Sequence, residues 1–194
     1  MDEIKLGCVI LAAGLSRRFS GGDKLLLRVE GVPMIDRAVM ASQCGCFKRT
    51  AAVCSSGEVA ARAEALGVET AMNDAPEAGQ SVSVAIGTAL MRDMDGCAFI
   101  VADQPYLTEK TVAGAASAFD GRSIVQTACG DLRGSPVIFP RRFFDELMAL
   151  TGDTGGREVI RAHSRDIKLF DIGDRRELLD IDVNLEAIDA PLSI

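Results

Sequence analysis

Features that define several large classes of protein are missing from this chain of 194 residues. The most apolar stretch near its start covers only residues 6–13, well short of the roughly 18 residues that a membrane-spanning helix needs. The same stretch lacks the length and the cleavage site of a signal peptide. Basic residues number 21 against 28 acidic ones, for a net charge of -7, which argues against nucleic acid as a partner. We therefore expect a cytoplasmic protein that binds neither a membrane nor nucleic acid.

Cysteine and histidine are present, but not in the pattern of a zinc or redox site. The chain has six cysteines and one histidine, and no two cysteines have the CxxC spacing. The tightest pair is Cys44 and Cys46, separated by Gly45. We interpret the six as reduced, mostly buried thiols of a cytosolic protein. His163 has no visible partner and is interpreted as a structural or surface residue.

Strand-like and helix-like segments alternate through the first 120 residues. Apolar segments that suit buried strands cover residues 6–11, 50–54, 68–71 and 97–102, and helical patterns cover 33–43, 58–66, 81–91 and 108–119. Further strands at 123–128 and 136–139 predict an antiparallel pair, followed by short helices (143–150, 158–162) and a strand at 167–170. The pattern predicts an α/β fold with a Rossmann-like, mostly parallel mixed sheet and helices on both faces. Because no linker interrupts it, residues 1–194 are expected to form a single domain.

The segment after the first strand carries residue types that suit phosphate binding. It contains Leu11, Ala12, Ala13, Gly14, Ser16, Arg18 and Lys24. Small residues let backbone N–H groups surround a phosphate, and basic side chains neutralise its oxygens. The Walker A pattern and GxGxxG are both absent, so a dinucleotide site is not supported. Ligands of such sheets bind beyond the carboxyl ends of the strands, so chemistry is expected here and after residue 102. The alternative is a solvated turn with incidental basic residues.

The motif LAAGxSxR…K in this segment resembles the nucleotidyltransferases of the molybdenum-cofactor group, the MobA-like NTP transferases. Five further segments resemble motifs of that family and follow in the family order: GQSVS at 79–83, VADQP at 101–105, RGSPV at 133–137, GDTGGR at 152–157 and DID at 180–182. The matches run from residue 6 to about residue 186. Two departures stand out: Lys24 lies one residue further from Gly14 than is usual, and the Thr-Pro that follows DID in the family is replaced by Val183-Asn184.

The resemblance implies a role for individual residues. Asp103 and Asp182 would bind Mg²⁺, with Asp180 as the competitor of Asp182. Arg18 and Lys24 would bind the triphosphate and stabilise the leaving pyrophosphate, so Lys24, Arg18 and Asp103 are the implied catalytic residues. The implied nucleotide contacts also include Leu11, Ala12, Ala13, Gly14, Ser16, Gly79, Ser81 and Ser83, and Arg157 would bind the phosphate of the acceptor.

Local structural roles compete with some of these assignments. Asp103 suits a turn or helix cap before Pro105, and Ser81 and Ser83 suit the N-cap of a helix. Arg157 suits a solvated helix start. For Ser81 and Ser83, capping and a ribose contact are compatible.

The resemblance implies a fold of the nucleotide-diphospho-sugar transferase type and an Mg²⁺-dependent nucleotidyltransferase. The VADQP and RGxPV variants are most similar to the cytidylyltransferase branch, which implies transfer of CMP from CTP to the terminal phosphate of molybdenum-bound molybdopterin. Three alternatives stay open: GTP as donor, a sugar or polyol phosphate as acceptor, and a non-catalytic accessory protein that hands the finished cofactor to a molybdenum hydroxylase. Such a hydroxylase is also the client that the enzyme reading implies.

Overall fold

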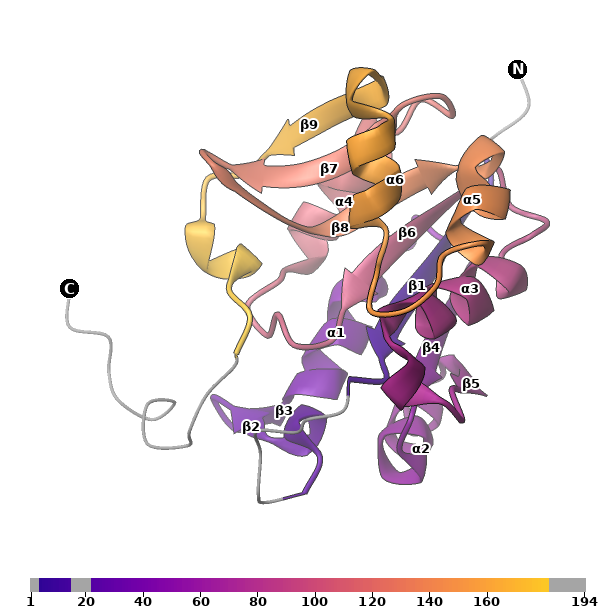
Figure 1. The fold of residues 1–194 in the computed structure, drawn as a ribbon. Coiled ribbons are helices and arrows are strands. Elements are labelled where there is room, and N and C mark those ends of the chain that lie inside the picture. Colours follow the sequence, from indigo (N-terminus) through magenta and orange to yellow (C-terminus); the bar gives the residue numbers. More distant parts are fainter. Residues whose placement is uncertain (1–3, 15–21, 182–194) are drawn as a thin grey trace.

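A seven-stranded sheet runs through the computed structural model, which describes residues 4–14 and 22–181 (Figure 1). Its strands are β1 (Leu6–Ala12), β4 (Arg49–Cys54), β5 (Glu69–Met72), β6 (Gly96–Val101), β7 (Ile124–Cys129), β8 (Leu132–Pro140) and β9 (Ile167–Asp171). The spatial order is β5-β4-β1-β6-β8-β7-β9. Strand β1 is parallel to both of its neighbours, whereas β8 is antiparallel to β6 and β7. The predicted α/β fold with a mostly parallel mixed sheet is confirmed.

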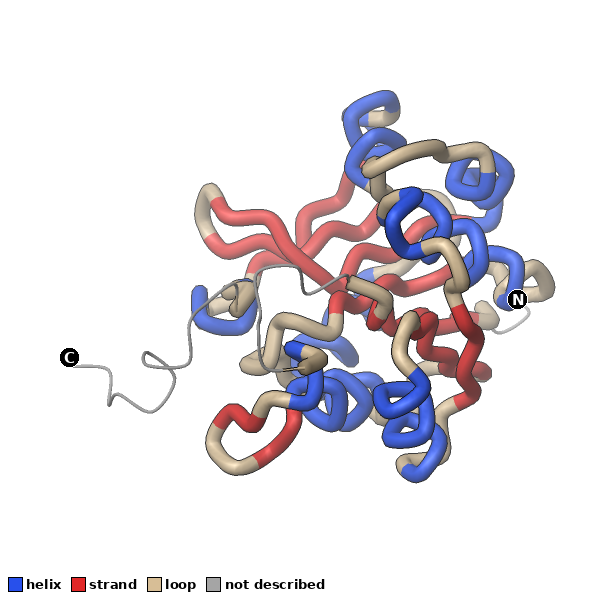
Figure 2. Tube along the Cα trace, turned by 60° about the horizontal axis from the view of Figure 1, so that its bottom comes forward, coloured by secondary structure: helices blue, strands red, loops and turns tan. Residues whose placement is uncertain are grey.

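Helices cover both faces of this sheet, as Figure 2 shows. The α-helices are α1 (Met34–Ser42), α2 (Gly57–Ala65), α3 (Gln80–Leu90), α4 (Glu109–Ala118), α5 (Phe144–Met148) and α6 (Arg157–Ala162). Five 3-10 helices in the described residues are η1 (Lys24–Leu26), η2 (Pro76–Ala78), η3 (Arg141–Phe143), η4 (Ser164–Asp166) and η5 (Arg175–Leu178). In the ranges covered by the structure, no helix is both long and apolar enough to cross a membrane.

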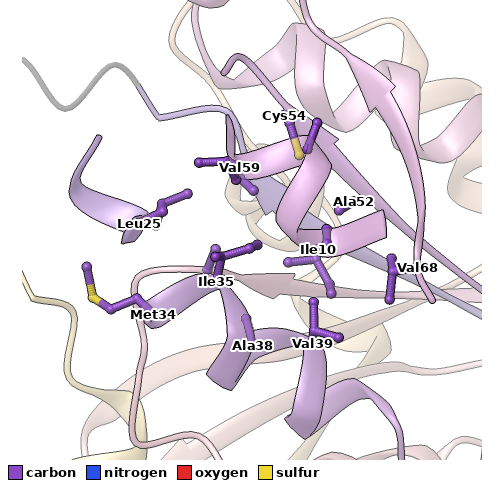
Figure 3. Packing of buried hydrophobic residues seen from close by; sticks show 14 of the residues in the cluster. Ile10, Leu25, Met34, Ile35, Ala38, Val39, Ala52, Cys54, Val59 and Val68 are labelled. Carbon is purple, nitrogen blue, oxygen red and sulfur yellow. The ribbon is translucent and has the colours of Figure 1, made fainter. Parts of the chain in front are cut away.

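The alternation of side chains along β1 assigns the helices to the two faces. Ile10 packs with residues of α1 and α2, including Val39 and Val59, in the cluster of Figure 3. Val9, on the opposite face, packs with residues of α3 and α5. Since successive side chains of a strand point to opposite faces, a strand covered on both sides must be apolar throughout. This explains why residues 6–12 form a continuous apolar run.

The predicted antiparallel pair is present, and the structure adds a small hairpin that sequence patterns did not indicate. Strands β7 and β8 are joined through Gly130, which has a φ of +56°. The additional hairpin consists of β2 (Arg28–Val29) and β3 (Val32–Pro33). Two-residue strands carry no readable periodicity, so they escape detection in the sequence. The prediction of a single domain over residues 1–194 extends beyond the described ranges and stays a prediction.

Candidate active site

The carboxyl ends of β1 and β6 lie side by side at the centre of the sheet. Leu11 is in register with Val53 on one side and Val101 on the other, and the N–H of Ala102 donates to the carbonyl of Leu11 at 3.1 Å. Ala12 ends β1, and Ala13 and Gly14 follow it at this edge. Among the described residues beyond its chain neighbours, none lies within 4 Å of a Cβ built at Gly14, which leaves space beside the backbone there. That space is suited to close approach by a ligand.

Lys24 and Asp103 meet at this edge although 79 positions separate them. The Nζ of Lys24 donates to Oδ2 of Asp103 at 3.1 Å. Lys24 opens η1, whose N-cap residue Asp23 accepts a hydrogen bond from the N–H of Leu25 at 2.9 Å. Asp103 follows β6 directly, and its side chain is 31% exposed, against 18% for Lys24. The edge therefore presents a cation and a carboxylate that solvent can reach.

Within the described residues, the carboxylate of Asp103 does not cap a turn or a helix, which was the alternative role. The carboxylate accepts from Nζ of Lys24, and the backbone carbonyl of Asp103 accepts from the N–H of Ile181 at 3.0 Å. The N-cap of α4 is instead Thr108, whose hydroxyl accepts from the N–H of Thr111 at 3.2 Å. The Asp103 carboxylate is therefore directed at Lys24 rather than at its own turn.

The segment from Gly79 to Ser83 anchors a second loop to the start of α3. The hydroxyl of Ser81 donates to the carbonyl of Gly152 at 2.7 Å. The hydroxyl of Ser83 accepts from Nδ2 of Asn73 at 2.9 Å. Gly79 has a φ of +103°, and a Cβ there would collide with the backbone of Gly152. The expectation that the serines cap the helix is wrong, because α3 begins at Gln80 and its N-cap, Gly79, has no side-chain cap.

The loop before α6 packs closely against this same segment. A Cβ on Gly155 would collide with the side chain of Gln80, and one on Gly156 would lie 2.8 Å from the ring of Phe139. Arg157, predicted to bind the acceptor, is the first residue of α6 and is exposed. The structure therefore attaches the acceptor segment, which carries Arg157, to the segment predicted to bind the nucleotide. A solvated helix start describes Arg157 as it stands.

A buried amide that the sequence analysis did not single out connects three of the motifs. Gln104 is 5% exposed, and its Oε1 accepts from the hydroxyl of Ser135 at 2.6 Å. Its Nε2 donates to Oδ1 of Asp180 at 2.8 Å. The position inside VADQP was visible in the sequence, but its partners lie 31 and 76 residues away and no local pattern reveals them.

A divalent cation fits the carboxylate of Asp103 at this edge. This carboxylate is partly exposed, whereas Oδ1 of Asp180 is already bonded to Nε2 of Gln104. Within residues 4–14 and 22–181, no group of three or more His, Cys, Asp or Glu gathers into a complete metal cage. Mg²⁺ commonly takes only one or two protein carboxylates together with water and substrate phosphates, so this sparse donor set suits it. Ser16, Arg18 and Asp182 lie outside the described residues.

One cysteine, Cys54, lies near this edge, because it ends β4 in register with Ala12. All six cysteines are free, and Cys8, Cys54 and Cys97 are buried. Burial raises the pKa of Cys44 to about 11, which keeps it protonated near neutral pH. His163 does have a partner: its Nε2 lies 2.8 Å from a carboxylate oxygen of Glu146.

Comparisons with known proteins agree with this architecture. The profile of the MobA-like NTP transferase domain matches residues 8–167. The chain is similar to Rv0371c from Mycobacterium tuberculosis, with 21% identity, a TM-score of 0.77, and 92% of this chain and 93% of the other covered. It is also similar to a nucleotidyl transferase from Methanothermobacter, with 20% identity, a TM-score of 0.80 and 92% of each chain covered.

A curated relative shows similarity at the level of sequence. The chain is 38% identical over 121 residues to the bifunctional protein GlmU of Maricaulis maris. This match covers 60% of the chain but only 26% of that longer protein. The family match and the fold together are those of a nucleotidyltransferase. The chain belongs to the MobA-like NTP transferase domain family, because the family profile covers most of its length.

Proposed function

We propose that this nucleotidyltransferase transfers CMP from CTP to the terminal phosphate of molybdenum-bound molybdopterin and releases pyrophosphate. The observation that carries the proposal is the meeting of Lys24 with Asp103 at the open end of β1, with a 3.1 Å contact between them. A cation for phosphates and a hard oxygen ligand are the two components that transfer of a nucleotidyl group needs. The VADQP and RGSPV variants support the cytidine branch.

The protein's part in this reaction is alignment and charge stabilisation. The backbone around Ala12, Ala13 and Gly14 contacts the nucleotide, and Lys24 donates to the triphosphate oxygens. As pyrophosphate leaves, the charge on it grows, and the ammonium of Lys24, with the guanidinium of Arg18, stabilises that charge. Leu11, Ser16, Gly79, Ser81 and Ser83 complete the proposed nucleotide-binding set.

The buried serines of that set also act through position. Ser81 and Ser83 already bond to Gly152 and Asn73, so they fix the loops that border the nucleotide. Arg157, on the attached loop, binds the phosphate of the acceptor. A guanidinium suits this role because it binds phosphate oxygens in pairs.

Asp103 and Asp182 hold a divalent cation, for which we propose Mg²⁺. When bound, the cation neutralises phosphate charge and fixes the phosphate orientation. A solved neighbour, the Rv0371c complex with manganese, supports a divalent cation in this fold. Asp182 comes next in the chain after Ile181, whose N–H bonds to the carbonyl of Asp103.

A polyol phosphate is the second candidate acceptor. The chain is similar in fold to 4-diphosphocytidyl-2C-methyl-D-erythritol synthase of Anaerococcus prevotii, with 13% identity and a TM-score of 0.72. The name of that protein combines a cytidyl group with a polyol. It therefore supports a cytidine donor and, as the alternative acceptor, a polyol phosphate.

The test is pyrophosphate release from CTP, GTP, ATP and UTP with Mg²⁺, using molybdenum-loaded molybdopterin, a sugar phosphate or a polyol phosphate as acceptor in separate reactions. The expected result is release with CTP alone, and no release by the folded Asp103→Asn variant. Release with GTP alone would contradict the donor assignment, and release only with a sugar or polyol phosphate would contradict the acceptor. Nucleotide-independent binding of the finished cofactor, without any release, would favour the accessory-protein alternative and its molybdenum hydroxylase client.

A further inference from the structure

The buried amide of Gln104 is bonded at both ends. Its Oε1 accepts from the hydroxyl of Ser135, and its Nε2 donates to Oδ1 of Asp180 at 2.8 Å and to the carbonyl of Leu178 at 3.4 Å. Ser135 also accepts a hydrogen bond from the N–H of Val101, at 3.4 Å. The amide thus joins the end of β6, the strand β8 and the segment after η5.

The orientation of this amide is determined by its partners. The carboxylate of Asp180 and the carbonyl of Leu178 are acceptors only, so they require the NH₂ end of Gln104. The hydroxyl of Ser135 then donates to the oxygen end. Glutamate has the same shape as glutamine but brings a second oxygen in place of the NH₂. At position 104 it would oppose two acceptors at once.

The hydrogen bonds of Gln104 to Ser135 and Asp180, here called the bridge, hold the chain segment 177–181 against the loop that carries Asp103. Besides the contacts of Gln104, the N–H of Ile181 donates to the carbonyl of Asp103 at 3.0 Å. Glu177, which is buried, accepts from both the N–H and the hydroxyl of Thr108, at 2.9 and 2.8 Å. The segment 177–181 is therefore held at two further points. Its last residue bonds to the carbonyl of Asp103, and its first residue, Glu177, bonds to Thr108.

We propose that Gln104 and Asp180 are positioning residues: their hydrogen bond holds the segment ending at Ile181 against the loop of Asp103, and so fixes the backbone that carries the Asp103 carboxylate of the cation site. In this arrangement Asp180 serves as the acceptor of the bridge, not as a ligand of the cation. The inference rests on the proposed function, because it assumes a cation held beside Asp103. It also bears on the competition between Asp180 and Asp182, since Oδ1 of Asp180 is already bonded to Nε2 of Gln104.

Exchange of the donor and the acceptor tests the bridge. Mn²⁺ binding is measured by the electron paramagnetic resonance of the free ion at pH 8, alone and with CTP or GTP. Gln104→Glu is expected to weaken Mn²⁺ binding about tenfold, the lower end of what loss of an outer-shell partner costs. Asp180→Asn keeps an acceptor and is expected to stay within about threefold of wild type. The double variant is expected to recover to within about threefold, because the introduced amide donates to the introduced carboxylate.

Gln43→Glu is the matched control. Gln43 is a glutamine at the end of α1 whose Nε2 donates to the carbonyl of Leu66 at 3.1 Å. The control has the same change of charge and loses one donor, but it is not part of the bridge. Its Mn²⁺ affinity should equal that of wild type, and a tenfold loss there would show that charge alone explains the effect and would overturn the bridge.

The outcomes separate this proposal from the proposed function. If wild type binds Mn²⁺ and a folded Gln104→Glu variant binds it equally well, the bridge is overturned while the enzyme assignment stands. If Gln104→Glu fails to fold, Asp180→Asn decides: loss of Mn²⁺ binding as complete as in Asp103→Asn makes Asp180 a ligand and overturns the proposal. If wild type binds neither Mn²⁺ nor nucleotide, the proposed function fails, and the bridge proposal with it.

Discussion

The proposed cation site puts Lys24 in competition with the cation for the carboxylate of Asp103. The Nζ of Lys24 lies 3.1 Å from Oδ2 of Asp103. Replacement of Lys24 by Met removes this competitor and leaves a side chain of similar length. We expect the Lys24→Met variant to bind Mn²⁺ more tightly than wild type when no nucleotide is present. With nucleotide and acceptor, the same variant should react more slowly, because the ammonium no longer stabilises the leaving pyrophosphate.

The size of the first effect follows from the distance and the exposure of the pair. At 3.1 Å and an effective dielectric constant of about 20, the attraction between unit charges is roughly 5 kcal/mol. Both side chains are partly exposed, at 18% and 31%, so solvent and side-chain entropy reduce the net interaction to about 1 kcal/mol. That free energy corresponds to about a fivefold change in the Mn²⁺ dissociation constant.

Isothermal titration calorimetry with Mn²⁺ measures this change in the dissociation constant. Lys110→Met, at an exposed position of α4, is the control for the lost charge. Lys24→Arg keeps the cation and should keep the wild-type affinity. Unchanged or weaker Mn²⁺ binding by a folded Lys24→Met protein would refute the reasoning, since it would mean that Lys24 does not compete for Asp103.

Three further predictions concern stability and reactivity. Gly79→Ala should reduce the free energy of unfolding by at least about 2 kcal/mol in urea titrations. The loss should exceed that of Gly45→Ala, because both glycines have a positive φ but, of the two, position 79 alone faces a close backbone. Equal losses would contradict the packing argument. Alkylation of Cys44 by iodoacetamide in the native protein should be slow at pH 8 and rise about tenfold per pH unit toward its pKa of about 11, as seen by mass spectrometry; a plateau near pH 9 would disprove it. The hydrogen bond from the N–H of Ser123 lowers the pKa of Asp120 to about 2. The ionised carboxylate of Asp120 therefore stabilises the fold fully above its ordinary pKa near 4, and this stabilisation is lost as the pH falls toward 2. Asp120→Ala should therefore lower Tm at pH 6 but not at pH 2, and an equal decrease at both would argue against the shift.

Sequence patterns predicted the elements of the sheet well where burial is continuous. The run from Leu6 predicted β1 to within one residue, because a strand between two layers of helices has no polar side. The cap at Thr108 was also predictable, since a cap forms within one turn. The hairpin of β2 and β3 was missed because its strands are only two residues long.

The serines of the GQSVS segment show where local rules fail. Ser81 and Ser83 lie near a helix start and suit capping. Their hydroxyls instead form hydrogen bonds with the carbonyl of Gly152 and with the side chain of Asn73. A capping bond is local, and competing tertiary partners are invisible from one segment. The roles proposed for Arg157 and for the residues outside the described ranges stay predictions.

The sequence by itself determined the alternation of strands and helices, the family, and the residue types available at the ends of the central strands. These follow from short-range periodicity and from motifs read along the chain. Only the tertiary structure decided that Lys24 meets Asp103 and that Gln104 joins Ser135 to Asp180. Those contacts connect residues 31 to 79 positions apart. The first arises because the parallel strands β1 and β6 bring their carboxyl ends to one edge, which the strand pattern led us to expect. The second depends on the antiparallel strand β8 and on the segment after η5, whose places beside that edge no local pattern encodes.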